Sequence, residues 1–432
     1  MHGMDAIPQE RTLALCELLF PIARSITGNG VRQTLRLLQD RIPLLLHEVP
    51  SGTRVFDWTV PLEWNVEAAY VCDENGNRLV DLDEHSLHLV SYSEPFRGRL
   101  TLEELQPHLH SLPAHPDWIP YRTSYYDKSW GFCLRHSDRQ GLTPGLYDIA
   151  IDSTLAEGSL TYGELVVPGE TQAEVLVSTH VCHPSLANDN LSGIAVATFL
   201  AKHLMDADHA RRYTYRFLFI PGTIGAITWL ALNEQHLHRV VGGVVLSGVG
   251  DAGSLTYKRS RSGGTTIDRV FERVLHRRGE SNRILPFIPY GYDERQYCSP
   301  GINLPVGCLM RTPFGEYPEY HTSGDNLDFI VADAMEETLS VCLEAFDELE
   351  CTRTYRNLSP KCEPQLGRRG LYEAIGGDND RRVAQMALLW MLSYSDGSNS
   401  TLDIGDLSGL DLESLYRAAV RLKEANLLVE EV

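Results

Sequence analysis

The sequence has no uninterrupted apolar run of about 18 residues, the length that a membrane-spanning helix needs. Its first ten residues are polar, and the apolar run over 13–22 is interrupted by Cys16, Glu17 and Pro21, so no signal peptide is predicted. The nine cysteines are scattered singly without a CxxC pair, which argues against a disulfide framework and for reduced thiols. We therefore expect a cytoplasmic protein with no membrane partner.

Basic residues are also few: 38 Lys and Arg stand against 58 Asp and Glu, for a formal net charge of -20. Because proteins bind nucleic acids largely by neutralising phosphates, this balance argues against a nucleic-acid partner. The apolar share of 43% is ordinary for a globular protein, and 432 residues allow one large domain with one or two smaller ones. The composition leaves a homo-oligomer open.

The pattern of apolar residues changes twice along the chain. After two amphipathic helices predicted over 11–26 and 30–42, short runs bounded by Pro, Gly, Asn and Asp predict a small β-rich domain over 55–155. Beyond it, strand-length apolar runs alternate with helical patterns. This alternation predicts an α/β domain with a largely parallel sheet and helices on both faces. Its functional residues should lie at the carboxyl ends of the strands. The predicted strands are 174–178, 215–220, 240–246 and 304–310, and the predicted helices are 191–205, 226–237 and 266–277.

The last fifth of the chain predicts a separate small unit. Residues 353–380 contain several Pro and Gly residues and read as a linker, and 381–432 predict a helix, a Ser/Asp/Gly loop and a second helical region. The size and order of these elements are typical of a winged-helix-like module. From Asp380 onward nine residues are acidic and five are basic, so we expect a packing role rather than DNA binding. The predicted domains are 1–54 with 156–352 (α/β), 55–155 (inserted β-rich), 353–380 (linker) and 381–432 (winged-helix-like).

The densest polar segment, 178–193, follows the first strand of the α/β domain. It places His180, His183 and Asp189 within ten residues. Neutral imidazole and carboxylate oxygen are both good zinc ligands. The competing interpretation is that the histidines make ordinary hydrogen bonds in a loop and Asp189 caps the following helix.

A second polar segment, 316–326, follows the strand predicted over 304–310 and contains Tyr320 and His321. Ends of parallel strands meet at one edge of a sheet. Two segments rich in ligand residues at such ends therefore favour a metal site over isolated loop histidines.

The run Ala187-Asn-Asp-Asn-Leu-Ser-Gly193 resembles the Ala-x-Asp-Asn-x-Ser-Gly signature of the zinc aminopeptidase/carboxypeptidase superfamily, which uses two co-catalytic metals. The resemblance implies that His180 is the first histidine ligand, with His183 as the other candidate, that Asp189 bridges the metals and that His321 is the last histidine. It also implies that Tyr320 holds the tetrahedral intermediate. Asp251 matches the carboxylate of the second metal more loosely.

Nearly the whole chain is also similar to a bacterial family of aminopeptidase-like proteins. This resemblance implies a peptidase-type core, an inserted β-domain and a C-terminal winged-helix-like module. Five segments carry it: 24–28 (RSITG), 49–60 (VPSGTRVFDWTV), 119–126 (IPYRTSYY), 290–297 (YGYDERQY) and 363–371 (EPQLGRRGL).

The sequence departs from the superfamily pattern at the position of the catalytic base. In the aminopeptidases a Glu-Glu pair follows the second strand, where one glutamate is the general base and the other is a metal ligand. Here that strand runs into 221–225 (PGTIG), and Cys182 replaces an orienting aspartate. We therefore expect one zinc ion, with a second uncertain. We take Glu294 as the candidate base and Arg295 as a partner for a substrate carboxylate.

The sequence thus predicts a metal-dependent hydrolase of aminopeptidase type, acting on an amide bond of a small peptide or an amino-acid conjugate. The alternative is a non-catalytic metal- or ligand-binding protein of the same fold that has lost its base. A transcription factor acting through the C-terminal module conflicts with the acidic charge.

Overall fold

The computed structural model describes residues 10–208, 210–371 and 379–431. The chain divides into two compact units, Met1–Cys342 and Leu343–Val432. Parts of three predicted domains lie outside the described residues: residues 1–9 and 209 of the α/β domain, residues 372–378 of the linker, and Val432 of the C-terminal module. In the described part of the chain, no helix is long and apolar enough to cross a membrane.

An eight-stranded sheet forms the centre of the first unit. Its four central strands are parallel, because β11 pairs in parallel with β12 and β13, and β13 with β16. The strands lie in the order β1 (Leu45–Pro50), β10 (Ser159–Val167), β12 (Thr214–Ile220), β11 (Glu174–His180), β13 (Val240–Leu246), β16 (Val306–Met310), β14 (Thr256–Lys258) and β15 (Arg283–Leu285).

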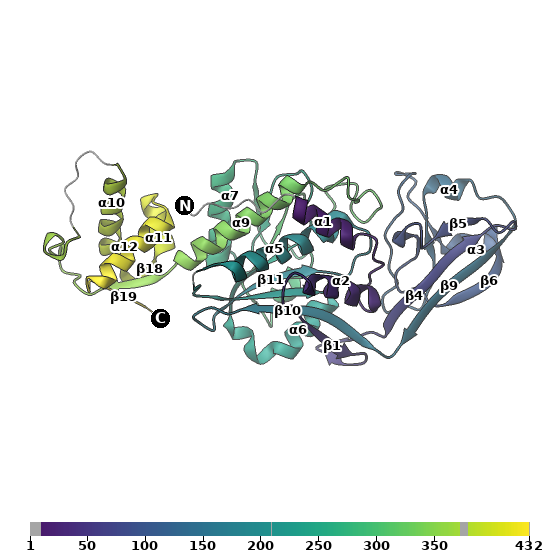
Figure 1. Cartoon of the computed structure of the whole chain (residues 1–432), viewed down its shortest axis with the longest axis horizontal. Coiled ribbons are helices and arrows are strands. Elements are labelled where there is room, and N and C mark those ends of the chain that lie inside the picture. Colours follow the sequence, from purple (N-terminus) through teal and green to yellow (C-terminus); the bar gives the residue numbers. More distant parts are fainter. Residues whose placement is uncertain (1–9, 209, 372–378, 432) are drawn as a thin grey trace. The chain divides into compact units, whose positions relative to one another are not determined.

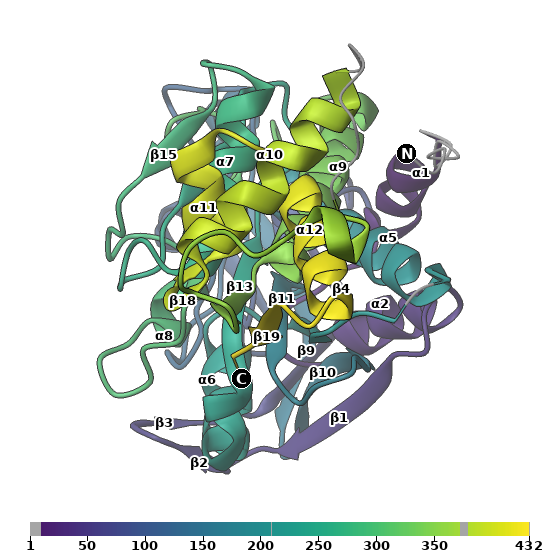
Figure 2. The ribbon, with the colours of Figure 1, turned by 90° about the vertical axis from the view of Figure 1, so that its left-hand side faces the viewer.

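The central strands are buried on both sides of the sheet. Every residue of β11 and of β16 is buried, which is why these strands read as nearly continuous apolar runs rather than as alternating patterns. Helices α2 and α5 lie over one face and α6 over the other (Figures 1 and 2). The helices of this unit are α1 (Glu10–Leu19), α2 (Asn29–Gln39), α3 (Leu102–Leu105), α4 (His136–Gln140), α5 (Gly193–Asp206), α6 (Ile224–Asn233), α7 (Thr266–Arg278) and α8 (Glu294–Tyr297). The predicted α/β architecture, with a largely parallel sheet and helices on both faces, is confirmed.

The residues between β1 and β10 form a second, smaller sheet. Its antiparallel strands lie in the order β5 (Arg78–Asp81), β4 (Glu63–Cys72), β9 (Leu146–Ala156) and β6 (Phe96–Thr101). Short pairs of strands accompany it, namely β2 (Arg54–Val55) with β3 (Trp58–Thr59) and β7 (Leu109–His110) with β8 (Phe132–Cys133). The chain thus leaves the large sheet after β1, builds this β-rich region and returns in β10.

The second unit begins within α9 (Ala332–Cys351), and its described residues also form the helices α10, α11 and α12 and a three-stranded sheet. Two features differ from the prediction: the predicted Ser/Asp/Gly loop holds a strand and a helix, and a strand lies in the predicted linker. That last strand, β17, pairs with β18 and β19, so its residues belong to the C-terminal sheet. The elements are β17 (Thr354–Asn357), α10 (Asn379–Tyr394), β18 (Asp396–Ser400), α11 (Thr401–Ser408), α12 (Leu412–Glu424) and β19 (Leu428–Glu430).

Candidate metal centre

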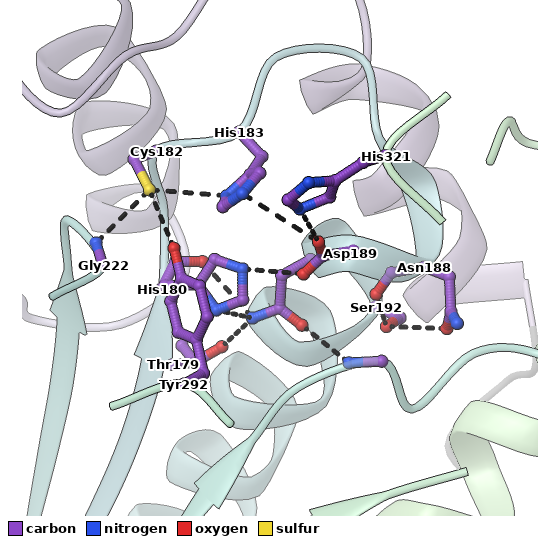
Figure 3. A network of polar contacts seen from close by, with 12 residues as sticks. Thr179, His180, Cys182, His183, Asn188, Asp189, Ser192, Gly222, Tyr292 and His321 are labelled. Carbon is purple, nitrogen blue, oxygen red and sulfur yellow. Dashed lines mark hydrogen bonds and ion pairs between the residues drawn. The ribbon is translucent and has the colours of Figure 1, made fainter. Parts of the chain in front are cut away.

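Three histidines and one aspartate meet at the carboxyl edge of the large sheet (Figure 3). His180 is the last residue of β11, and His183 lies three residues further on in the connection to α5. Asp189 lies in the turn just before α5, and His321 lies in the long connection between β16 and α9. The polar residues that follow these strand ends therefore lie close together in the structure.

The carboxylate of Asp189 is the centre of the cluster. His180 Nε2 lies 2.9 Å from Asp189 Oδ1, and His321 Nε2 lies 3.1 Å from Asp189 Oδ2. His183 Nε2 is 3.9 Å from Oδ2. His180, His183 and Asp189 can each offer a ligand atom such that these atoms all lie within 4.8 Å of one another.

Burial and the contacts within the cluster together determine the charges of its side chains. His180, His183 and Asp189 are buried, whereas the side chain of His321 keeps 35% of its exposure. Burial holds the pKa of His183 well below its usual range. Burial alone would raise the pKa of Asp189, but the nearby His183, the hydrogen bond from His180 and the close contact with His321 outweigh burial and hold that pKa well below its usual range. A neutral imidazole thus faces an ionised carboxylate near neutral pH.

A buried second aspartate holds the turn that carries Asp189. The carboxylate of Asp325 accepts hydrogen bonds from the backbone nitrogens of Asn188 (2.5 Å) and Asp189 (2.9 Å). Burial raises the pKa of Asp325 to about 8. On the other side, Asn190 donates to the Thr179 hydroxyl (2.8 Å) and accepts from the Gly248 nitrogen (3.1 Å). The position of Asp189 is therefore fixed by groups from three other segments, those of Asp325, Thr179 and Gly248.

The β-rich region holds the loop that carries His321. The Tyr121 nitrogen donates to the His321 carbonyl oxygen (2.8 Å), and Pro120 and Thr322 form a β-bridge. His321 has a φ of 56°, a left-handed conformation that costs a residue with a Cβ about 1 kcal/mol or more. These backbone contacts hold it there. The Ser323 nitrogen also donates to a backbone oxygen of the same segment, that of Ile119 (2.8 Å).

Three tyrosines surround the histidine rings. Tyr121 lies with its ring centroid 5.0 Å from that of His183 and 5.2 Å from that of His321. Tyr320 stacks on His321 at 4.0 Å. A third tyrosine, from the segment before α8, covers His180: the ring centroids of Tyr292 and His180 are 3.8 Å apart.

A buried arginine lies behind His183. The Arg24 side chain donates from Nε to the His183 carbonyl oxygen (3.0 Å) and from Nη1 to the Leu19 carbonyl oxygen (2.6 Å). Burial lowers the pKa of Arg24 to about 10. This cation anchors the backbone of the loop and adds positive charge next to His183, which is one of the causes that lower the pKa of that imidazole.

Two of the proposed site carboxylates have other partners in the structure. Asp251 accepts hydrogen bonds from the Asn188 side chain (3.0 Å), the Thr312 hydroxyl (2.6 Å) and the Gly253 nitrogen (2.8 Å). It therefore holds the loops after β13 and β16 together. Glu294 is fully buried and forms an ion pair with Lys258, which is also buried.

The two residues beside Glu294 differ from it. Arg295 is exposed. Asp293 is buried, and its Oδ1 accepts a hydrogen bond from the Thr223 nitrogen (2.6 Å), whereas its Oδ2 has no partner. Burial raises the pKa of Asp293 to about 7. A carboxylate from this segment thus reaches the loop in which the resemblance places the missing glutamates.

The donor set fits a divalent metal of the zinc type. Asp189 Oδ2 and His321 Nε2 are buried atoms that make no well-directed hydrogen bond although they lie 3.1 Å apart. Such orphaned atoms suit a cation between them better than a hydrogen bond. Imidazole nitrogen and carboxylate oxygen are ordinary zinc ligands, and His180 and His183 add two further nitrogens.

Several residues of the site were not assigned a role from the sequence. Arg24, Tyr121 and Tyr292 all lie in segments that carry the family resemblance, and Asp325 lies in the polar segment around His321. The only sign in the sequence that these residues belong to the site is that they lie in those segments. Nothing in the sequence places them around one carboxylate, because they come from four different parts of the chain.

Residues 13–352 match the family model described as "Domain of unknown function (DUF4910)", and residues 353–430 match one described as "winged helix-turn-helix". A protein of Clostridium acetobutylicum, named as a polysaccharide biosynthesis protein with aminopeptidase-like domain, is 49% identical over 414 residues. This alignment covers 96% of this chain and 95% of the relative.

Solved structures agree with this relationship. A crystal structure from Clostridium acetobutylicum, named as that of a peptidase, is 47% identical and superposes with a TM-score of 0.90, over 98% of this chain and 96% of that one. A zinc aminopeptidase from Bacillus subtilis superposes with a TM-score of 0.58 at 14% identity, over 79% of this chain and 94% of that one. A peptidase precursor from Shewanella amazonensis gives 0.55 at 14% identity, over 79% of this chain and 93% of that one. The fold of the first unit is that of the zinc aminopeptidases, as predicted.

Proposed function

This chain belongs to the family defined by the domain of unknown function DUF4910, with a C-terminal winged helix-turn-helix domain, and from that premise we propose that it is a metal-dependent amide hydrolase. Its substrate would be a peptide or an amino-acid conjugate. One observation carries the proposal: the nitrogens of His180, His183 and His321 converge on the carboxylate of Asp189 at the strand ends of an aminopeptidase fold.

His180, His183, His321 and Asp189 would hold the metal, which we take to be zinc. A bound zinc ion polarises a carbonyl group and acidifies water at neutral pH. Around it, Asp325 fixes the turn of Asp189, while Tyr320 and Tyr121 pack against His321 and orient its ring.

The best candidate for the proton acceptor is Asp293 rather than Glu294. The carboxylate of Glu294 is bound to Lys258, whereas Asp293 keeps one buried oxygen without a hydrogen-bond partner. A carboxylate oxygen without a partner can accept a proton without breaking an ion pair. Arg295 is exposed next to Asp293 and is one of the groups that lower the pKa of Asp293.

The name of one relative adds two substrate classes to those that the fold suggests. The Clostridium acetobutylicum relative is named as a polysaccharide biosynthesis protein. N-acylated amino sugars and aminoacylated sugars therefore belong in the substrate screen beside dipeptides and aminoacyl amides.

The metal is tested by elemental analysis of protein prepared without chelator. We expect about one zinc per wild-type chain, sharply less in His321→Ala and an unchanged amount in the control His236→Ala, which changes an exposed histidine. A wild type without metal, or a His321→Ala variant with full metal, would remove the basis of the proposal.

Hydrolysis is then tested with the metal-loaded wild type on the panel of amides. Asp293→Asn should keep the metal and lower turnover by about 100-fold, the usual effect of losing a positioned proton acceptor. A metal-bound wild type that cleaves nothing on the panel would support the second candidate, a non-catalytic binding protein. The absence of a carboxylate from 221–225 is the observation that favours that candidate.

A further inference from the structure

The segment between β15 and α8 ends with a tyrosine on the histidine cluster. The ring of Tyr292 lies 3.8 Å from the ring of His180, centroid to centroid, at an angle of 33°. Its hydroxyl lies 3.5 Å from the sulfur of Cys182. Figure 3 shows the phenol beside the ring of His180, with its oxygen toward the Cys182 sulfur. The ring of Tyr292 thus lies against His180, a proposed metal ligand, and its hydroxyl lies at the sulfur of Cys182, which is itself 3.4 Å from His183 Nδ1.

The hydroxyl of Tyr292 occupies the space that a side chain at position 222 would need. A Cβ added to Gly222 would lie 1.9 Å from that hydroxyl and 2.4 Å from two ring carbons. Real Cβ atoms are not found closer than about 3.0 Å to such atoms. Gly222 lies in the loop where the resemblance places the Glu-Glu pair. The phenol therefore fills the space next to Gly222, in the loop for which the resemblance predicts acidic side chains.

Hydrogen bonds to buried charged side chains fix the backbone on both sides of Tyr292. The Tyr292 nitrogen donates to the Glu294 carboxylate (3.0 Å), and Glu294 pairs with Lys258, which also donates to the Tyr290 carbonyl oxygen (2.9 Å). Asp293 accepts from the Thr223 nitrogen at 2.6 Å. Buried charges of this kind are costly to desolvate and often add no net stability. Their arrangement here fixes the direction in which Tyr292 points.

We propose that Tyr292 positions the substrate: its hydroxyl donates a hydrogen bond to the carbonyl oxygen of an amide group held at the histidine cluster. The contact that the hydroxyl makes in the described structure is with the Cys182 sulfur, a weak hydrogen-bond partner. A carbonyl oxygen is a much better acceptor and would replace it. This inference rests on the proposed function in that it takes the cluster as the place where the substrate binds.

The first experiment tests, without any assay of activity, whether Tyr292 lies against Gly222. A thermal-unfolding double-mutant cycle combines Gly222→Ala with Tyr292→Ala. Gly222→Ala should lower the melting temperature clearly in the wild type but have little effect when Tyr292 is already alanine, because the colliding ring is gone. In the control background Tyr290→Ala, which changes a side chain that is 64% exposed, the full cost of Gly222→Ala should remain. Additive effects of Gly222→Ala and Tyr292→Ala would overturn the geometric premise.

The second experiment tests the hydroxyl itself. Tyr292→Phe keeps the ring on His180 and removes only the donor, so zinc content and melting temperature should stay close to the wild type. Losing one hydrogen bond of ordinary strength should lower kcat/KM for the best amide substrate by about 10-fold. We expect that loss mainly in KM if the bond forms with the bound substrate and mainly in kcat if it strengthens during the reaction. The control Tyr290→Phe should match the wild type.

A probe that binds without turnover separates this inference from the proposed hydrolysis. Leucine hydroxamate carries a carbonyl oxygen and a metal-binding group, and its Kd can be measured by calorimetry on the zinc-loaded protein. A 10-fold higher Kd in Tyr292→Phe, with a wild type that cleaves no amide, would support the role of Tyr292 and reject the hydrolase. Equal Kd and equal activity in Tyr292→Phe and wild type would overturn the role of Tyr292 and leave the hydrolase untouched. A wild type that neither cleaves the panel nor binds the hydroxamate would overturn both.

Discussion

Replacing Glu294 by glutamine should destabilise the first unit strongly, because it leaves a buried ammonium group without its counter-charge. The side chains of Lys258 and Glu294 are 2% and 0% exposed, and they form a direct ion pair. Removing one partner of such a pair typically costs about 3–5 kcal/mol. For a unit of this size about 2 °C is lost per kcal/mol. Glu294→Gln should therefore lower the melting temperature by about 6–10 °C.

The assay is thermal unfolding followed by calorimetry, with two comparison variants. Glu316→Gln breaks the exposed pair of Glu316 with Arg283, whose side chains are 48% and 44% exposed, and should cost less than about 1 kcal/mol. The double variant Lys258→Met/Glu294→Leu removes both charges and should be more stable than Glu294→Gln, because apolar residues of similar size often replace a buried pair without loss.

The same measurement separates a structural from a catalytic role for Glu294. A glutamate that acts as a base at the cluster would be replaced by glutamine with little effect on unfolding, whereas the ion pair predicts a large effect. A Glu294→Gln protein that melts within about 1 °C of the wild type would refute a structural role for the pair of Lys258 and Glu294.

Two further predictions concern pH and DNA. Burial raises the pKa of Asp293 to about 7, so the folded protein holds a proton that the unfolded chain releases near pH 4. Between about pH 4 and 7 the wild type should therefore lose stability relative to Asp293→Asn as the pH rises, with no further change above that range. A stability difference that does not vary with pH in denaturant titrations would contradict this. In gel shifts at low salt the full chain should not bind a DNA duplex tightly, because residues 353–430 carry ten basic and eleven acidic residues, and a tight, salt-sensitive shift would contradict this.

The architecture of the first unit could be predicted because each of its buried strands can be identified from a few consecutive residues. The buried strands β11, β12, β13 and β16 are short apolar runs, and each is followed by a turn-rich segment. The same dependence on a few consecutive residues explains the two misses in the second unit. The Ser, Asp and Gly content of residues 393–406 predicts a loop, yet Ser400 and Asp403 form a capping box that starts α11. The four residues of β17 are too few to show a period.

Only those site residues could be predicted that lie in segments rich in ligand residue types after a strand. His180, Asp189 and His321 follow strand ends and carry a recognisable pattern, so their convergence was expected. Which way a loop carboxylate points is decided by its partners. Asp251 turns to Asn188 and Thr312, and Glu294 turns to Lys258. No spacing in the sequence reveals those pairings.

The backbone contacts between residues 119–121 and the His321 loop limit how the sequence of this protein can change in evolution. Two segments about two hundred residues apart share one short stretch of β-pairing, and one of them carries a proposed ligand in a left-handed conformation. The β-rich region can therefore not be exchanged as an independent cassette, as an appended domain could. An insertion or deletion near Ile119 would shift the pairing partner of Thr322 and with it the imidazole of His321. Sequence variation in that region is therefore limited by the geometry of the site, even though the contacts concerned are made by the backbone.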